Sequence, residues 1–270
     1  MSKQKIKSNS NRKTVALALG GGAARGFAHV GIIKRLIEHK VPIDGIAATS
    51  AGSIVGGFYA AGLHIDTIAH ICTHLSWKNF ARFRFGLHRA LFSSEPIQDL
   101  IMKYLGEMTF SDLKIPFIPL ATDILSGEGA PLSDANLQLA LAIRASASFP
   151  GVFEPVNING STYFDGGASY NIPSRVARDM GADVVIGVDV IPKTVLKKVP
   201  RYMPILIDRG LDCLLRSSAK YTYQDADLML VPIKERINSF NFKRAKHLIQ
   251  LGIQSVDDSI DEIRKLVAQD

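Results

Sequence analysis

Ser50 lies between two short apolar stretches, within a cluster of very small residues. Residues 43–48 fit a buried strand, and residues 51–61 fit a helix that ends at Gly62. A serine at such a strand-to-helix corner is pushed clear of the sheet, where its hydroxyl can act as a nucleophile. The pattern matches Gly-x-Ser-x-Gly except that Ala48 replaces the first glycine. An ordinary turn before a core helix is the alternative interpretation.

A glycine-rich stretch at 20–26 follows an apolar strand at 14–19 and precedes a helix at about 27–39. Such a loop presents unpaired N–H groups and the positive end of a helix to an anion. The glycine spacing fits neither the dinucleotide pattern nor the P-loop, which disfavours nucleotide binding. The loop suits an oxyanion instead, with Arg25 nearby as a fixed charge for substrate. Tight helix–strand packing is the alternative.

Asp165 follows two aromatic residues and precedes two glycines, which hold it out on a tight loop. Its carboxylate can take a proton from a serine or orient a base that does so. An ordinary Asp-Gly turn is the alternative. Histidine is the usual partner of a serine nucleophile, but only His29 and His39 lie near these motifs, and both belong to the first helix. The sequence therefore offers a serine–aspartate pair, Ser50 and Asp165.

Two further segments carry residues with potential chemistry. His70 and His74 have the spacing of two ligands on one metal, but nothing completes the set, so we predict an ordinary helix surface and no metal site. Residues 79–92 mix arginines with phenylalanines. We favour a loop whose phenylalanines pack inward while its arginines stay solvated. The alternative is a lid or substrate-entry surface that meets lipid headgroups.

Strands alternate with helices along the chain, which predicts a mostly parallel sheet covered on both faces. The other expected strands are 117–124, 129–132, 184–189 and 228–232. The other expected helices are 64–77, 94–105, 137–147, 173–181, 203–223 and 243–267. Turns are expected at 126–127 and 159–160. In the helix at 203–223 the residues available for burial are Leu206, Leu211, Leu214 and Leu215.

Composition and charge indicate one large domain, 14–270, in a chain of 270 residues that is 47% hydrophobic. Residues 1–13 hold five basic residues and no acid, +5 of the net +7. We expect a solvated, disordered tail that touches anionic lipid weakly at most, and no nucleic-acid partner. No secretory or membrane-spanning pattern is found, and Cys72 and Cys213 fit reduced thiols. The expectation is a cytoplasmic protein, with peripheral contact at the inner membrane face as an option.

Five blocks of the sequence together resemble patatin-like phospholipases. They are 21–26, 48–52, 145–153, 165–167 and 171–173, and the resemblance covers roughly 15–189. Several motifs in order are far more specific than any one of them. The resemblance implies a three-layer α/β/α sandwich and a Ser–Asp dyad that hydrolyses acyl esters without histidine, metal or cofactor. It also implies lipid esters as substrates, as for a phospholipase A or lysophospholipase.

The residues that match the family's site are Ser50 as nucleophile, Asp165 as base and, as oxyanion-hole donors, the backbone N–H groups of Gly21, Gly22 and Ala23. The family has glycine at the positions of Ala23 and Ala48. A methyl group at Ala48 crowds the elbow, and one at Ala23 is strained if that residue needs a positive φ. Two alternatives therefore stay open: a thioesterase or small-ester hydrolase on the same dyad, and a weakly active or inactive regulatory or interaction protein.

Overall fold

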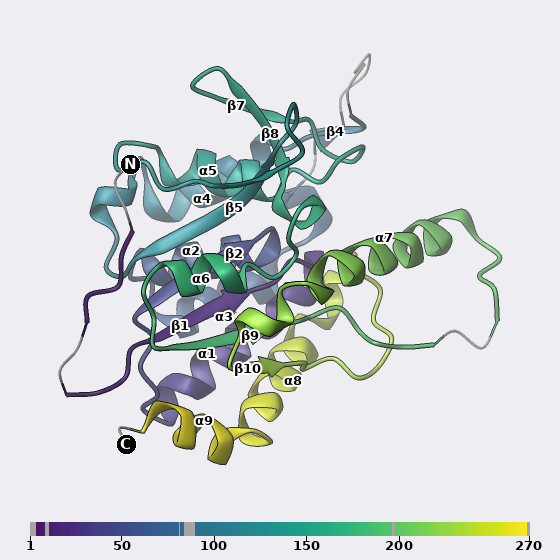
Figure 1. Cartoon of the computed structure of the whole chain (residues 1–270). Coiled ribbons are helices and arrows are strands. Elements are labelled where there is room, and N and C mark those ends of the chain that lie inside the picture. The colour runs from purple at the N-terminus through teal and green to yellow at the C-terminus, as the bar shows by residue number, and fades with distance from the viewer. Residues whose placement is uncertain (1–3, 9–10, 81, 84–89, 196–197, 269–270) are drawn as a thin grey trace.

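The computed structural model describes residues 4–8, 11–80, 82–83, 90–195 and 198–268. At its centre is one sheet with the strand order β10-β9-β1-β2-β5-β8-β7, and β6 pairs with β5 (Figure 1). The first five of these strands are parallel, while β6, β7 and β8 run antiparallel to their neighbours. The strands are β1 (Val15–Leu19), β2 (Gly45–Thr49), β5 (Phe117–Asp123), β6 (Gly129–Pro131), β7 (Val156–Ile158), β8 (Ser161–Asp165), β9 (Val184–Val188) and β10 (Leu228–Leu230).

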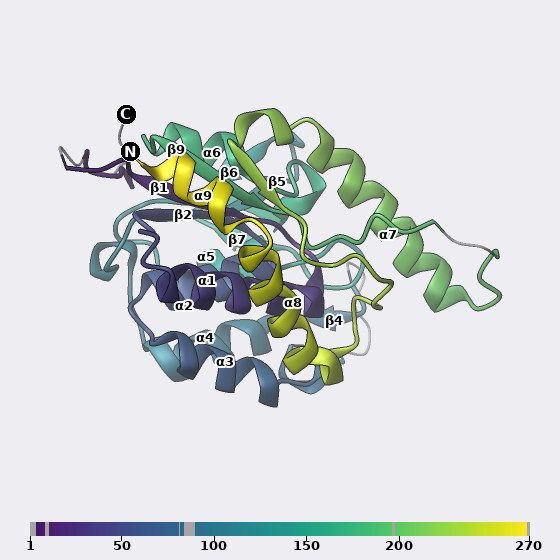
Figure 2. The same cartoon turned by 90° about the horizontal axis from the view of Figure 1, so that it is seen from below.

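Helices lie on both sides of this sheet (Figure 2). They are α1 (Ala28–Glu38), α2 (Ala51–Ala60), α3 (Ile65–His74), α4 (Glu95–Leu105), α5 (Leu139–Ser146), α6 (Ser174–Asp179), α7 (Met203–Lys220), α8 (Ala245–Asp257) and α9 (Ile260–Val267). Short 3-10 turns include η1 (Ala23–Phe27), η2 (Trp77–Asn79) and η4 (Gly166–Ala168). A small hairpin joins β3 (Arg82–Phe83) to β4 (Phe92–Ser93). Within the described ranges, each helix is too short or too polar to cross a bilayer.

The side chains of β1 show why helices cover both faces. Leu17 and Leu19 enter the larger apolar core, while Ala16 and Ala18 enter a smaller one. This follows from the period of two along a strand. Helices α2 and α5 pack on the face of the larger core, and α6 packs on the other. The fold is therefore the expected three-layer α/β/α sandwich with a mostly parallel sheet.

The register of three strands brings the two candidate reactive residues to one edge. Thr49, the last residue of β2, pairs with Leu120 of β5. The next residue of β5, Ala121, pairs with Asp165, the last residue of β8. Because β8 runs antiparallel to β5, its end lies beside the middle of β5 and close to the end of β2. Ser50 and Asp165 thus come together although 115 positions separate them in the sequence.

Two expectations about the ends of the described chain are wrong. The single helix expected at 243–267 is two helices, since α8 ends at Asp257 and α9 begins after Ser259. Helix α9 has two acidic residues in its first turn, where they suit the positive helix end. At the other terminus, Ile6 is buried against Gly45 and its N–H bonds to Met180. These residues of the expected disordered tail therefore pack on the body of the protein.

Candidate active site

Ser50 occupies a sharp corner between β2 and α2, with φ 54° and ψ −122°. Residues other than glycine rarely adopt a positive φ, so this backbone is strained. The helix can start close to the sheet because Gly52 lacks a side chain: a Cβ there would lie 2.4 Å from the Leu19 carbonyl oxygen. The Ser50 side chain makes no capping hydrogen bond to α2. Its hydroxyl is therefore not engaged by the helix that follows it.

The backbone of the corner is held from both sides. The Ser50 N–H donates to Oγ of Ser146 on α5 over 3.1 Å, and that hydroxyl donates to the Leu120 carbonyl over 2.6 Å. On the helix side, the Ser50 carbonyl accepts from the Ser53 N–H at 2.8 Å. Ser146 thus links the elbow to β5. Its role is new here, since the sequence placed it only within a resembling block.

Asp165 is fixed at the end of β8 by hydrogen bonds around it. Its backbone N–H donates to the Ser148 carbonyl over 2.9 Å, and its carbonyl accepts from the Thr122 hydroxyl at 3.0 Å. Its Oδ1 accepts the Gly167 N–H at 2.8 Å. The residue is only 1% exposed. The carboxylate is therefore held in one place and shielded from water.

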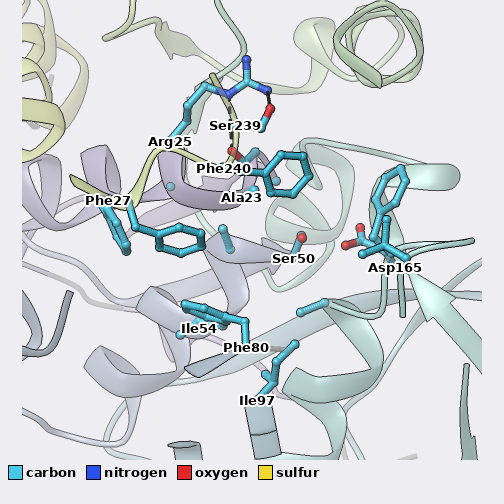
Figure 3. A pocket seen from close by; sticks show the side chains of 18 of the residues that line it. Ala23, Arg25, Phe27, Ser50, Ile54, Phe80, Ile97, Asp165, Ser239 and Phe240 are labelled. Atoms are coloured by element: carbon cyan, nitrogen blue, oxygen red, sulfur yellow. Dashed lines mark hydrogen bonds between the residues drawn. The ribbon is translucent and has the colours of Figure 1, made fainter. Parts of the chain in front are cut away.

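The other carboxylate oxygen of Asp165, Oδ2, makes no hydrogen bond among the described residues. Ser50 and Asp165 lie side by side at the cavity (Figure 3). Burial raises the Asp165 pKa to about 6, while the nearby Ser50 hydroxyl and the Gly167 N–H act in the opposite direction. Above this pKa the group is an ionised base beside the serine.

The glycine-rich loop presents fewer donors than the sequence suggested. The Gly21 N–H donates to Asn171, at 3.3 Å to its carbonyl and 3.1 Å to its Oδ1. The Gly21 N–H is therefore engaged by a fully buried asparagine in this structure, and its role as an oxyanion donor stays a prediction. In the described part of the chain, neither Gly22 nor Ala23 uses its N–H in a hydrogen bond. Both line the cavity with Ser50, so their N–H groups remain as candidate donors.

The two alanines that replace family glycines sit in different backbones. Ala23 has φ 51°, in the left-handed region where a Cβ is unfavourable by about 1–2 kcal/mol. Ala48 lies in regular β2, paired with Leu19 and Pro119, and its methyl group is fully buried in the larger core. Only Ala23 is therefore strained. Its N–H is nonetheless present at the position that the loop requires.

His29 supports the start of the loop rather than the dyad. The histidine is fully buried, and its Nε2 lies 2.8 Å from the Gly20 carbonyl oxygen. Burial lowers its pKa to about 4, so the ring is neutral near pH 7 and Nε2 donates to that carbonyl. Its Nδ1 has no partner within the described residues.

Arg25 does not present a free charge to a substrate. Its Nη2 is 2.6 Å from Oδ1 of Asp212 on α7 and 2.5 Å from Oγ of Ser239. Its side chain is 1% exposed. Although Arg25 lines the cavity, its guanidinium points toward Ser239 rather than Ser50 (Figure 3). Its charge is thus neutralised by a buried acid that the sequence places far away, and the substrate-binding role stays a prediction.

The cavity beside Ser50 holds about 980 Å³ of empty space, its open mouth included. Its walls are mainly apolar, and the largest side chains come from Phe27, Trp77, Phe80, Phe149, Phe153, Phe240 and Phe242. The rings of Phe80 and Phe242 stack with centroids 5.1 Å apart. A pocket with these walls fits a hydrocarbon chain.

The segment at 79–92 contributes to this wall. Phe80 is buried and lines the cavity, and Phe92 packs edge-on against Trp77. The Arg82 side chain is exposed, 3.8 Å from Glu95. The favoured interpretation is thus confirmed at these positions, while 81 and 84–89 lie outside the described residues.

The spacing of His70 and His74 brings their two rings together on one helix. The rings of His70 and His74 lie 4.1 Å apart on α3. No group of three His, Cys, Asp or Glu side chains that could hold a metal ion occurs among the residues that the structure describes. Both thiols are free, with Cys72 buried and Cys213 exposed.

Comparison with known proteins identifies the family. The family model described as Patatin-like phospholipase matches residues 17–178, more than half of the chain and all of the site described above except the α7 wall and the loop of Ser239. The chain belongs to the patatin-like phospholipase family. An uncharacterized NTE family protein of Mycobacterium tuberculosis is 36% identical over 187 residues, which are 67% of this chain and 50% of that protein.

One further relative is found by sequence, and one solved structure is similar in fold. Lysophospholipase nte1 of Aspergillus fumigatus is 31% identical over 183 residues, 66% of this chain and 12% of that protein. The chain thus spans about half or less of the length of these curated relatives. The crystal structure of VipD from Legionella pneumophila superimposes with a TM-score of 0.63 at 13% identity, covering 96% of this chain and 70% of that one. This last likeness shows the fold alone.

Proposed function

We propose that the protein hydrolyses acyl esters of lipids, with Ser50 as nucleophile and Asp165 as base. The observation that carries the proposal is the placement of an unencumbered serine hydroxyl beside a buried carboxylate whose Oδ2 has no other partner in the described structure. Family membership and the similarity to a lysophospholipase support lipid esters as the substrate class. The apolar cavity next to the dyad is suited to an acyl chain.

The first half of the proposed reaction forms an acyl-enzyme. Asp165 accepts the proton of the Ser50 hydroxyl as Oγ attacks the ester carbonyl. The N–H groups of Gly22 and Ala23 stabilise the negative oxygen of the tetrahedral intermediate, as does the positive end of α2. The carbon–oxygen bond to the alcohol then breaks, and the alcohol leaves with the proton from Asp165.

The second half returns the free enzyme. Asp165 takes a proton from water, whose oxygen attacks the acyl carbonyl, and Ser50 leaves as the proton passes back to its Oγ. The products are a carboxylic acid and the regenerated hydroxyl. Each proton has an acceptor among the chain's own residues, so these steps need only the dyad, the backbone donors and water.

A fluorophosphonate probe, which reacts with activated serines, tests the dyad without knowledge of the natural substrate. We expect the wild type to label, and Ser50→Ala and Asp165→Asn not to label. Ser217→Ala is the control, because Ser217 is an exposed serine on α7. A folded wild type that does not label, or labelling that persists in Ser50→Ala, would overturn the proposal and favour the interaction-protein alternative.

The substrate class is tested with the active wild type on three acyl donors. Lysophosphatidylcholine, palmitoyl-coenzyme A and p-nitrophenyl butyrate represent a lipid ester, a thioester and a small ester. We expect the highest kcat/KM for the lipid ester, since the cavity wall is apolar and aromatic. Preference for the thioester would identify a thioesterase on the same dyad, and preference for butyrate a small-ester hydrolase.

A further inference from the structure

Helix α7 and residues 198–202 before it project from the body of the molecule (Figures 1 and 2). The inner face of α7 is buried through Asp208, Asp212, Leu215 and Ala219. Leu211 and Leu215 line the cavity that holds Ser50. The helix is therefore a wall of the site with its other side open to solvent.

That other side is apolar. Leu206 and Leu214 were expected in the core, but they are 46% and 68% exposed, so that expectation is wrong. The spacing of helical residues places them on one stripe with Met203, Ile207 and Tyr221, which are also exposed. In the preceding loop Val195, Val199 and Tyr202 are exposed as well. Eight large apolar or aromatic side chains thus gather on one segment, 195–221.

The charged side chains that this segment exposes to solvent are basic. Its described basic residues are Lys193, Lys198, Arg201, Arg209, Arg216 and Lys220, and its only acids are Asp208 and Asp212. Both acids are buried: Asp208 accepts from Ser239, and Asp212 pairs with Arg25. Within the described ranges, the arginines of the segment form no ion pair with an acid. Apolar residues flanked by basic ones form the pattern of a helix that lies in the surface of an anionic bilayer.

We propose that residues 193–195 and 198–221 form the surface by which this protein docks on a lipid bilayer with anionic headgroups, the apolar stripe of α7 inserted among the acyl chains. The inference rests on the proposed function in that a lipid hydrolase draws its substrate from such a surface. The charged side chains that this face turns to solvent are all basic, which argues for lipid over a second copy of the chain, because two such faces would repel each other.

The inner face of α7 connects the docking surface to the site. Asp212 holds Arg25, which lies two residues after Ala23 in the glycine-rich loop. Oγ of Ser218 donates to the Gly167 carbonyl over 3.2 Å, two residues after Asp165. One helix therefore contacts both the loop of the candidate oxyanion donors and the loop of the base. A lipid leaving the bilayer along α7 would meet Leu211 and Leu215 at the cavity.

The test measures vesicle binding in a Ser50→Ala background, so that binding is separated from hydrolysis. The vesicles are phosphatidylcholine with or without about 30% phosphatidylglycerol, an anionic lipid. We expect binding only with phosphatidylglycerol, weakened by added salt, and lost by about tenfold or more in Leu206→Asp/Leu214→Asp. The matched control is Leu125→Asp, since Leu125 is 92% exposed on the turn between β5 and β6.

A fluorescent label on Cys213 reports insertion directly. Cys213 is exposed on α7, whereas Cys72 is buried and its burial raises its pKa to about 12, so a thiol reagent modifies Cys213 selectively. We expect an environment-sensitive fluorophore there to shift to the blue on vesicles with phosphatidylglycerol. The same label on vesicles of phosphatidylcholine alone should not shift.

Three results would overturn the docking proposal. They are no binding to anionic vesicles, binding unchanged in Leu206→Asp/Leu214→Asp, and a dimer in solution that this variant converts to a monomer. The variant with Ser50 restored should keep the kcat of wild type on soluble p-nitrophenyl butyrate, which also shows that it folds. If vesicle binding follows the predictions but the wild type cleaves no ester, the proposed function fails and the docking surface stands.

Discussion

The two sides of the cavity are built in different ways. On one side, Ser50 and Asp165 stand at strand ends, and the backbone around each is bonded to neighbouring strands or helices. On the other side, α7 is joined to the site mainly through Asp212 and Ser218, and its outer surface is exposed and apolar. The sheet fixes the positions of Ser50 and Asp165, while the outer surface of α7 is available to contact a partner.

This difference between the sheet side and α7 shows where the fold can hold residues in energetically unfavourable conformations or environments. A positive φ at Ser50 and a buried, half-partnered carboxylate at Asp165 both cost stability. Such features persist only where the surrounding bonds over-determine them. No comparable strain occurs on α7 among its described residues, where no positive φ is found. Changes to the first side should therefore affect turnover most, and changes to the second should affect stability or location.

The largest effect is expected at Asp165. Asp165→Asn keeps the shape but removes the base, so kcat on a soluble ester should fall by about 10⁴-fold. The same variant should be more stable than wild type at neutral pH. In the wild type, the folded-state pKa of Asp165, about 6, exceeds the ordinary aspartate value of 3.8, so the contribution of this acid to stability is present below about 3.8 and lost as pH rises through about 6.

Unfolding in urea at about pH 7.5 and about pH 4 measures this second effect. Asparagine carries no such penalty, so the variant should gain on the order of 1–3 kcal/mol at the higher pH and little at the lower one. If Asp165→Asn loses activity and is also less stable than wild type at the higher pH, burial of the ionised Asp165 does not destabilise the folded protein.

Breaking the link between the two sides is expected to have the next largest effect. Asp212→Ala leaves the charge of Arg25 buried without its acid, so the free energy of unfolding should fall by about 3–5 kcal/mol. Asp212→Asn keeps an acceptor oxygen and should lose less. The matched control is Asp179→Ala, which breaks the exposed pair with Arg175 and should leave the unfolding midpoint unchanged. A loss below about 1 kcal/mol in Asp212→Ala would mean that α7 is not anchored through Arg25.

The pH dependence of the wild type is expected to come from the sheet side alone. Because only the ionised Asp165 is a base, kcat/KM on a soluble ester should fall about tenfold per pH unit below about 6 and stay level above it. His29 cannot produce this transition, since its pKa is lowered to about 4 by burial. Circular dichroism over the same range separates titration from unfolding. If Leu206→Asp/Leu214→Asp shifts the pH of this transition, then α7 changes the pKa of the base. That result would contradict the separation between a sheet side that sets the chemistry and a helix side that does not.

The sequence was most informative on the sheet side. Strand-to-loop transitions around Ser50 and Asp165 are local, so residue type and spacing reveal them. The partners of these loops are not local: Asn171 bonds to Gly21 over 150 positions, and Asp212 to Arg25 over 187. No local pattern reports such pairs, so the sequence did not show that the Gly21 N–H and the Arg25 guanidinium are already bonded.

The sequence was least informative about α7. The helix itself was expected, but its leucines occur on both sides, and periodicity does not say which side meets the core. Leu215 is buried whereas Leu206 and Leu214 face solvent. The placement of Asp208 and Asp212 inside decides the orientation, because their partners Arg25 and Ser239 lie in the body of the protein. That information exists only in the folded chain.

The smallest effect is expected at the two alanines, and it should differ in sign. Ala23→Gly relieves a strain of about 1–2 kcal/mol but frees the unfolded chain by about 0.4–1 kcal/mol, so the protein should gain between about 0 and 1.6 kcal/mol. Ala48→Gly removes a buried methyl group from a regular strand and should cost about 1–2 kcal/mol. Urea unfolding measures both.

Turnover decides what the alanines mean for function. Because the Ala23 N–H already stands in the conformation that the loop requires, neither variant should change kcat by more than a few-fold. A rise of about tenfold or more in Ala23→Gly would mean that the methyl group misplaces an oxyanion donor. The weakly active alternative would then describe the natural sequence better than an efficient hydrolase does. If the wild type and both variants have equal kcat, the two alanines affect only stability, and the surrounding structure keeps the site in place despite them.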